Sequence, residues 1–344
     1  MSIIYLPAAA ESFDDLKLTF NLLSSFEKRY ETGIMLIIRG GEKGLKGRAK
    51  ESQFKNFERL TKEAGELPVI VMVSNLPLTD LDFYHLPEKS VRHIKLAVDF
   101  ASELPGKKGK AIATFHLNTL LTPEEWKNAG NNAEQRYKIF QNQFIKRVFP
   151  VLKKAADYAG SKRTELKVET TPVPEFGDMV NNSELNQLGN PYPIYSGRGF
   201  SEIRRLGIGI ALDFSHTFTL YKASAFLEKN NERFFEIYKG LFPSDIKKIK
   251  GKSFRQEIAA LQKGDVVHMN DSIGLFDPDR NQFHKEGVAL GEGEIEGLPD
   301  LLRALAASDV RIVFEINESD HKRRINLKRS IDYFWQNVYG NQNR

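Results

Sequence analysis

The sequence predicts an α/β protein folded as one (β/α)8 barrel, and three observations predict it. Eight short apolar runs alternate with longer amphipathic stretches along the chain. The runs are continuous rather than alternating, which is typical of strands buried on both faces of a parallel sheet. The chain has 344 residues, 41% of them hydrophobic, which suits one domain of this kind. We therefore expect residues 1–344 to form a single TIM barrel.

The predicted strands follow one another at intervals that leave room for a helix between most of them. A doubly wound open sheet is the competing fold, but no glycine-rich phosphate-binding fingerprint follows the first run. The predicted strands are Ile3–Leu6, Gly33–Arg39, Pro68–Ser74, Ala111–Leu117, Glu165–Thr171, Gly209–Phe214, Val266–Asp271 and Arg311–Asn317.

The stretches between the strands carry apolar residues at helical spacing. Pro150 lies inside one of them and should kink or break it, because proline removes a backbone donor from a helix interior. Helices are predicted over Phe13–Tyr30, Glu88–Leu104, Ala133–Tyr158, Leu298–Ala307 and Asn326–Tyr339.

Two connections are long. Pro172–Gly207, rich in Pro, Gly and Asn, is expected to be a long loop after the fifth strand. Tyr221–Lys263 is expected to hold two helices.

Composition excludes several kinds of chemistry. The chain has no cysteine, so disulfides, thiolate metal sites and a cysteine nucleophile are excluded. The net charge is +5 and the pI about 9.0. The basic runs, such as Lys247–Lys252, lack interleaved aromatic residues, so a solvated surface is favoured over a nucleic-acid site. With no apolar stretch near the roughly 20 residues of a membrane span and no basic N-terminal region, a cytoplasmic protein is expected.

Polar residues end the later strands. The runs from the fourth to the eighth end in His116, Glu169, Asp213, His268 and Glu315. In a barrel these positions meet at the C-terminal mouth, where functional residues lie.

Three carboxylates buried together would repel one another, and a divalent cation is the simplest remedy. We therefore expect Glu169, Asp213, His268 and Glu315 to bind one divalent metal ion (Mn, Mg, Co or Zn). Taken singly, each residue also has a structural explanation. Asp213, for example, could cap a helix beginning near Ser215.

At this point the chain resembles the xylose-isomerase-like barrels, a superfamily of sugar isomerases, sugar epimerases and endonuclease IV-type nucleases. The resemblance covers about residues 111–317. The matching segments are Val168-Glu169, Leu212-Asp213-Phe-Ser-His216, His268-Met-Asn270-Asp271-Ser272, Leu290-Gly-Glu-Gly-Glu-Ile295 and Phe314-Glu315.

The resemblance implies roles for further residues. It makes His216 a substrate contact in the epimerases and a ligand of a further zinc in the nucleases, and it matches His116 to a nuclease zinc ligand. The nuclease's third-strand histidine has no counterpart in Met72–Pro77. Its Asp-x-His before Leu-Gly-Glu-Gly falls on Lys285 and Gly287.

The three-zinc cluster of the nucleases therefore looks incomplete. His284 or Asp279 could complete a second metal site only through a shifted loop.

The resulting expectation is a metal-dependent isomerase or epimerase acting on a sugar or related polyhydroxy carbonyl compound through an enediolate. Glu169 and Glu315 would be the acid and base, and His116, His216 and Lys285 would bind substrate. Glu292 and Glu294 are expected to be loop residues. The alternatives are an apurinic-site endonuclease-like DNA-repair phosphodiesterase, with nucleic acid as its partner, and a non-catalytic metal-binding barrel.

Overall fold

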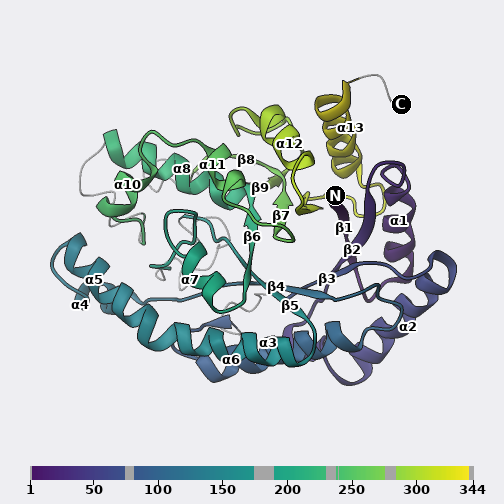
Figure 1. Ribbon diagram of the computed structural model, residues 1–344, viewed down its shortest axis with the longest axis horizontal. Helices are drawn as coiled ribbons and strands as arrows, with labels where there is room; N and C mark the ends of the chain where they lie inside the picture. Colours follow the sequence, from purple (N-terminus) through teal and green to yellow (C-terminus); the bar gives the residue numbers. More distant parts are fainter. Residues whose placement is uncertain are drawn as a thin grey trace.

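The computed structural model describes residues 2–73, 81–173, 190–229, 238, 240–275 and 284–340. Within these ranges, eight parallel strands close into a barrel in the order of the sequence, and the last strand pairs with the first (Figure 1). The predicted (β/α)8 fold and the positions of all its predicted strands are confirmed. The strands are β1 (Ile3–Ala9), β2 (Glu31–Ile37), β3 (Val69–Met72), β4 (Ile112–His116), β5 (Glu165–Glu169), β6 (Gly209–Asp213), β7 (Val266–Met269) and β10 (Arg311–Phe314).

Helices lie around the outside of the barrel (Figure 1). None of the described helices combines the length and apolar character that crossing a membrane requires. The described helices are α1 (Phe13–Leu23), α2 (Gly47–Ala64), α3 (Pro87–Glu103), α4 (Pro123–Asn128), α5 (Ala133–Gln143), α6 (Phe149–Ser161), α7 (Phe200–Arg205), α8 (Phe214–Lys229), α10 (Pro243–Ile249), α11 (Phe254–Ala259), α12 (Leu298–Ala306) and α13 (Ile325–Tyr339), with a 3-10 turn η1 (Gly41–Lys43) and a π-helical turn η3 (Phe144–Val148).

Two predicted helices differ in detail from the structure. α1 ends at Leu23 rather than Tyr30, because the hydroxyls of Ser24 and Ser25 donate to carbonyls of the preceding turn and compete with the helical pattern. The predicted helix Ala133–Tyr158 continues from α5 through the π-helical turn η3 into α6, and its junction residues all keep right-handed helical backbone angles. The expected break at Pro150 is therefore replaced by a π turn directly before it, a local change of hydrogen bonding at which a proline can be accommodated.

The two long connections contain more helix than the sequence predicted. The predicted loop Pro172–Gly207 includes helix α7, whose Glu202 carboxylate accepts the Gly199 N–H, so the loop prediction is wrong there. Residues 174–189 of that loop lie outside the described residues. The segment Tyr221–Lys263, predicted to hold two helices, contains α10, α11 and the second half of α8, while residues 230–237 and 239 lie outside the described residues.

A small hairpin that the sequence did not predict follows β7. Strands β8 (Asp271–Ile273) and β9 (Lys285–Val288) pair antiparallel and form a sheet separate from the barrel. This hairpin brings residues of the long β7–β10 connection back over the barrel mouth.

The barrel interior is filled by side chains from the middle of the strands. Tyr5 of β1 lies opposite Gly33 of β2, and a Cβ atom on Gly33 would lie 2.5 Å from the Tyr5 ring. Glycine at this position therefore makes room for the ring inside the barrel. The interior layer consists of Tyr5, Met35, Ile70, Ile112, Ala211, Val266 and Val313.

The strand register aligns the polar ends at one level. His116 of β4 pairs with Glu169 of β5, and Asp213 of β6 pairs with His268 of β7. The N–H of Glu315, just after β10, donates to the carbonyl of Met269. The register thus sets these five side chains on one rim, above the apolar layer.

Candidate metal centre

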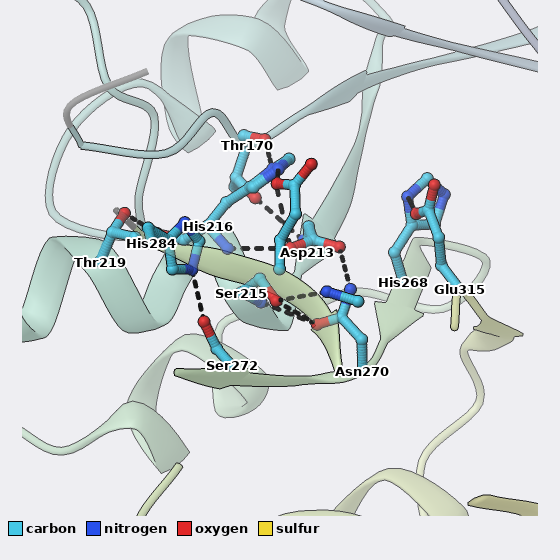
Figure 2. Close-up of polar contacts among 12 residues, drawn as sticks. Thr170, Asp213, Ser215, His216, Thr219, His268, Asn270, Ser272, His284 and Glu315 are labelled. Atoms are coloured by element: carbon cyan, nitrogen blue, oxygen red, sulfur yellow. Dashed lines mark hydrogen bonds and ion pairs between the residues drawn. The ribbon is translucent and has the colours of Figure 1, made fainter. Parts of the chain in front are cut away.

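Four side chains from neighbouring strands meet inside the barrel rim. Asp213, His268 and Glu315 each lie two positions after a residue of the interior layer, so the alternation along a strand points them into the barrel. One ligand atom from each of Glu169, Asp213, His268 and Glu315 lies within 4.8 Å of the others. Figure 2 shows His268 and Glu315 side by side. The structure therefore brings together the four residues predicted to bind a metal.

Glu169 is the most enclosed carboxylate of the group, at 1% exposure. Its Oε1 lies 3.0 Å from His116 Nε2 and 3.0 Å from His268 Nδ1, and Glu315 Oε2 lies 2.7 Å from the same nitrogen. Burial raises the pKa of Glu169, but His116 and His268 outweigh it and hold the pKa well below its usual range.

The other oxygen of Glu169 is a test of whether a cation fits. Glu169 Oε2 is buried and has no hydrogen-bond partner among the described residues. A buried carboxylate oxygen without a partner is costly, and a divalent ion would satisfy it. Three carboxylates and one imidazole form an oxygen-rich donor set that suits Mn²⁺, Mg²⁺, Co²⁺ or Zn²⁺. The residues present fit such an ion.

Asp213 combines a place in this group with a role in the fold. Its Oδ1 accepts the N–H of His216 at 2.8 Å, which caps the start of α8, and its Oδ2 accepts from the Asn270 amide at 2.8 Å. The hydroxyl of Ser215 donates to the Asn270 carbonyl oxygen at 2.8 Å and fixes that amide (Figure 2). Burial, together with the charges of Glu315 and Glu169, raises the pKa of Asp213 to about 6.

His216 lies at the edge of the group, between the backbone and an acid that the sequence did not predict. Its Nδ1 is 2.5 Å from the Thr170 carbonyl oxygen, which only accepts, so Nδ1 carries a proton. Its Nε2 is 3.2 Å from Glu286 Oε2, on β9. Burial lowers the pKa of His216, but Asp213 and Glu286 outweigh it and raise the pKa well above its usual value.

A cavity of about 110 Å³ opens above these residues. Four carboxylates, two imidazoles and two amides face it, and none of its described lining residues is a lysine or arginine. Such a lining can accept and donate many hydrogen bonds, which suits a small ligand rich in hydroxyl groups. The lining residues are Met72, His116, Glu169, Pro172, Asp213, His216, Asn270, Glu286, Gly287, Glu315 and Asn317.

The Leu-Gly-Glu-Gly segment has a structural role. Asp271 accepts the backbone N–H groups of Gly291 at 3.0 Å and Gly293 at 2.9 Å, and a Cβ atom on Gly293 would lie 2.2 Å from its carboxylate. Glu292 pairs with Arg329 and Glu294 with Lys222. These glutamates lie in the turn and not among the cavity's lining residues, as expected.

Other predicted residues lie elsewhere. Lys285 is exposed and does not line the cavity, although its neighbour Glu286 does. His284 is buried against Phe218, and its Nε2 pairs with the Ser272 hydroxyl (Figure 2). It therefore does not join the metal group, and Asp279 lies outside the described residues.

The family model described as "Xylose isomerase-like TIM barrel" matches residues 32–336 of this chain. A comparison with curated protein sequences gives no match.

Among solved structures, a D-tagatose 3-epimerase-like protein is similar, at 16% identity and a TM-score of 0.55, with 97% of each chain covered. The D-allulose 3-epimerase of Methylomonas sp. is 11% identical, with a TM-score of 0.53 over 98% of this chain and 99% of that one. A xylose isomerase-like TIM barrel protein from Mycobacterium smegmatis in complex with magnesium is 11% identical, with a TM-score of 0.51 over 98% of this chain and 96% of that one. At these identities the likeness shows the barrel fold.

Proposed function

The chain belongs to the xylose isomerase-like TIM barrel family, and from this premise we propose that it is a metal-dependent isomerase or epimerase of a sugar or related polyhydroxy carbonyl compound. The observation that carries the proposal is the convergence of Glu169, Asp213, His268 and Glu315 under a cavity lined with polar groups. The fold shared with a D-tagatose 3-epimerase-like protein and a D-allulose 3-epimerase supports a sugar substrate. The magnesium complex of the mycobacterial protein supports a divalent ion.

The two glutamates supply the proton chemistry in this proposal. Glu169 and Glu315 both line the cavity, so both carboxylates face the space in which a substrate would bind. One would remove the proton next to the carbonyl and the other would return it. A divalent ion held by the four residues would polarise the carbonyl and stabilise the negative charge of the enediolate. His116 and His216 line the cavity and would hold substrate oxygens.

Hydrogen exchange tests this proposal directly. The manganese-loaded protein is incubated in D₂O with a panel of free ketoses and aldoses, and NMR follows deuterium at the carbon next to the carbonyl. We expect exchange with at least one sugar and its loss in Glu169→Gln and Glu315→Gln. A metal-loaded protein that exchanges and converts none of the panel would contradict the proposal and favour a non-catalytic metal-binding barrel.

A second candidate function is phosphodiester cleavage of the endonuclease IV type. One specific observation favours it. Ligand atoms of His116, Glu169 and His216 also lie within 4.8 Å of one another, which could form a further ion position. Plasma mass spectrometry separates the two functions, since about three zinc ions per chain and nicking of abasic duplex DNA would favour the nuclease. About one ion per chain without nicking would favour the isomerase.

A further inference from the structure

Glu286 is an acid of the cavity that the predicted metal-ligand set does not use. It lines the same cavity as Glu169, Asp213 and Glu315, but it does not belong to either group of side chains that could hold an ion. Its side chain is 39% exposed, so it faces the open space of the cavity as well as His216. Its carboxylate is therefore placed to meet a bound substrate.

The fold fixes the backbone on which Glu286 sits. The side-chain amide of Asn317 donates to the Glu286 carbonyl oxygen at 2.8 Å, and the backbone N–H of Asn317 donates to the Gly287 carbonyl oxygen at 2.7 Å. The N–H of Gly287 donates to the Ser215 hydroxyl at 3.3 Å. Strand β9 is thus held between the ends of β6 and β10, and the position of Glu286 follows from the barrel.

Gly287 is necessary for this arrangement. Its φ is +68°, and a Cβ atom there would lie 2.5 Å from the Asn317 amide nitrogen. A residue other than glycine would be strained and would push Asn317 away. The hairpin is therefore built to bring β9 close against the rim.

The negative charge of Glu286 affects which ligands the cavity can bind. Three carboxylates of the metal group exceed the two positive charges of a divalent ion by one, and Glu286 adds a fourth carboxylate to the lining. The lining therefore stays negative even when the His216 imidazole beside Glu286 is protonated and offsets one of these charges. A carboxylate accepts a hydrogen bond from a hydroxyl group but repels a phosphate or a second carboxylate. Rejection of a related ligand by an opposing charge is a common source of specificity.

We infer that Glu286 makes this site selective for uncharged polyhydroxy substrates and excludes their phosphorylated or acidic counterparts. This inference rests on the proposed function, because it names the substrate class of the same site. Glu286 is a specificity-determining residue here, and the acid–base pair remains Glu169 and Glu315.

The test compares two ligands that differ by one phosphate. Isothermal titration calorimetry measures binding of D-mannitol and D-mannitol 1-phosphate to the manganese-loaded protein, so the readout does not depend on turnover. We expect the wild type to bind the uncharged polyol about tenfold more tightly, and Glu286→Gln to reduce that ratio by about tenfold. Glu286→Asp keeps the charge and should keep most of the preference. Thermal unfolding confirms that each variant is folded.

Glu294→Gln is the matched control, because it removes the same charge from a residue outside the cavity that pairs with Lys222. It should leave the ratio unchanged. The inference is overturned if the wild type binds the phosphate as tightly as the polyol, if neither ligand binds, or if Glu286→Gln leaves the ratio unchanged. If the wild type showed no hydrogen exchange with the sugar panel but kept this binding preference, the proposed function would be contradicted and the inference about Glu286 would stand.

Discussion

The two halves of the barrel rim differ in what their strands deliver. β1, β2 and β3 end in Ala9, Ile37 and Met72, whereas the barrel strands β4, β5, β6, β7 and β10 end in or next to acids and histidines. The polar groups of the first half serve the fold, since Asp15 accepts the Ala9 N–H at 2.7 Å and pairs with Arg324 at 2.5 Å. One half of the rim thus closes the barrel, and the other half gathers the groups from which chemistry could be built.

The strongest test of this contrast is Glu169→Gln. We expect proton exchange to fall by about a thousandfold or more, because the variant loses both a proposed base and a proposed metal ligand. Metal content and exchange rate are measured together. Glu165→Gln is the control at the other end of the same strand, where Glu165 pairs with Lys167 and Arg311. If proton exchange fell equally in Glu169→Gln and Glu165→Gln, the functional role of the rim position would be contradicted.

The pH dependence of stability tests the electrostatics of the functional half in the metal-free protein. Burial and two neighbouring acids raise the pKa of Asp213 to about 6 from 3.8. The folded state then holds this proton more tightly than the unfolded state, so the contribution of Asp213 to stability is most favourable below about pH 4 and is lost as the pH rises through about 6. In Asp213→Asn this contribution and its loss are absent.

Urea unfolding of both proteins isolates this effect. Between about pH 4 and pH 7 the free energy of unfolding of Asp213→Asn should gain about 2 kcal/mol on the wild type. The lost charge at the start of α8 adds an offset, so the change with pH is the informative quantity. If the free energy of unfolding changed with pH in the same way in both proteins, the pKa of Asp213 would not be raised in the folded state.

Gly33→Ala tests the half of the barrel that does not contribute to the metal group. The added methyl would meet the Tyr5 ring at 2.5 Å and the Pro68 carbonyl oxygen at 2.6 Å, so we expect a loss of about 1–3 kcal/mol in the free energy of unfolding. Metal content and exchange by the folded fraction should not change. Gly160→Ala in α6 meets nothing within 4 Å and should be neutral or slightly stabilising.

Lys285→Ala should have the smallest effect. Lys285 was predicted to bind substrate, but it is exposed and lies outside the cavity. We expect kcat/KM for the best sugar to change by less than about twofold. A tenfold fall would show that Lys285 reaches the substrate after all.

Most of the barrel could be predicted because each strand is a continuous apolar run. Such a run can be recognised in the sequence without knowing which strands lie beside it. The metal group could be predicted for a related reason. Glu169, Asp213 and Glu315 each interrupt or end an apolar run, and a charged residue in that place stands out. These residues come together only through the strand register of the closed barrel. The sequence indicates that register indirectly, because it predicts the barrel fold.

Glu286 could not be predicted from the same kind of signal. Strand β9 is four residues long, Lys285–Val288, and its partner β8 begins directly after Asn270, inside what looked like the end of one strand. Counting back from the Leu-Gly-Glu-Gly turn singled out Lys285 and Gly287. The residue between them faces the cavity, because hairpin pairing and not sequence distance decides which side chain points inward.

The double duty of Asp213 has a consequence for how sequences of this kind are compared. Since this side chain also caps α8, stability alone favours a capping residue here, aspartate or asparagine, in a descendant that has lost all chemistry. Among the residues that the structure describes, Glu315 pairs with His268 inside the site rather than capping a helix. When active and inactive descendants are to be told apart, the glutamate is the more informative marker.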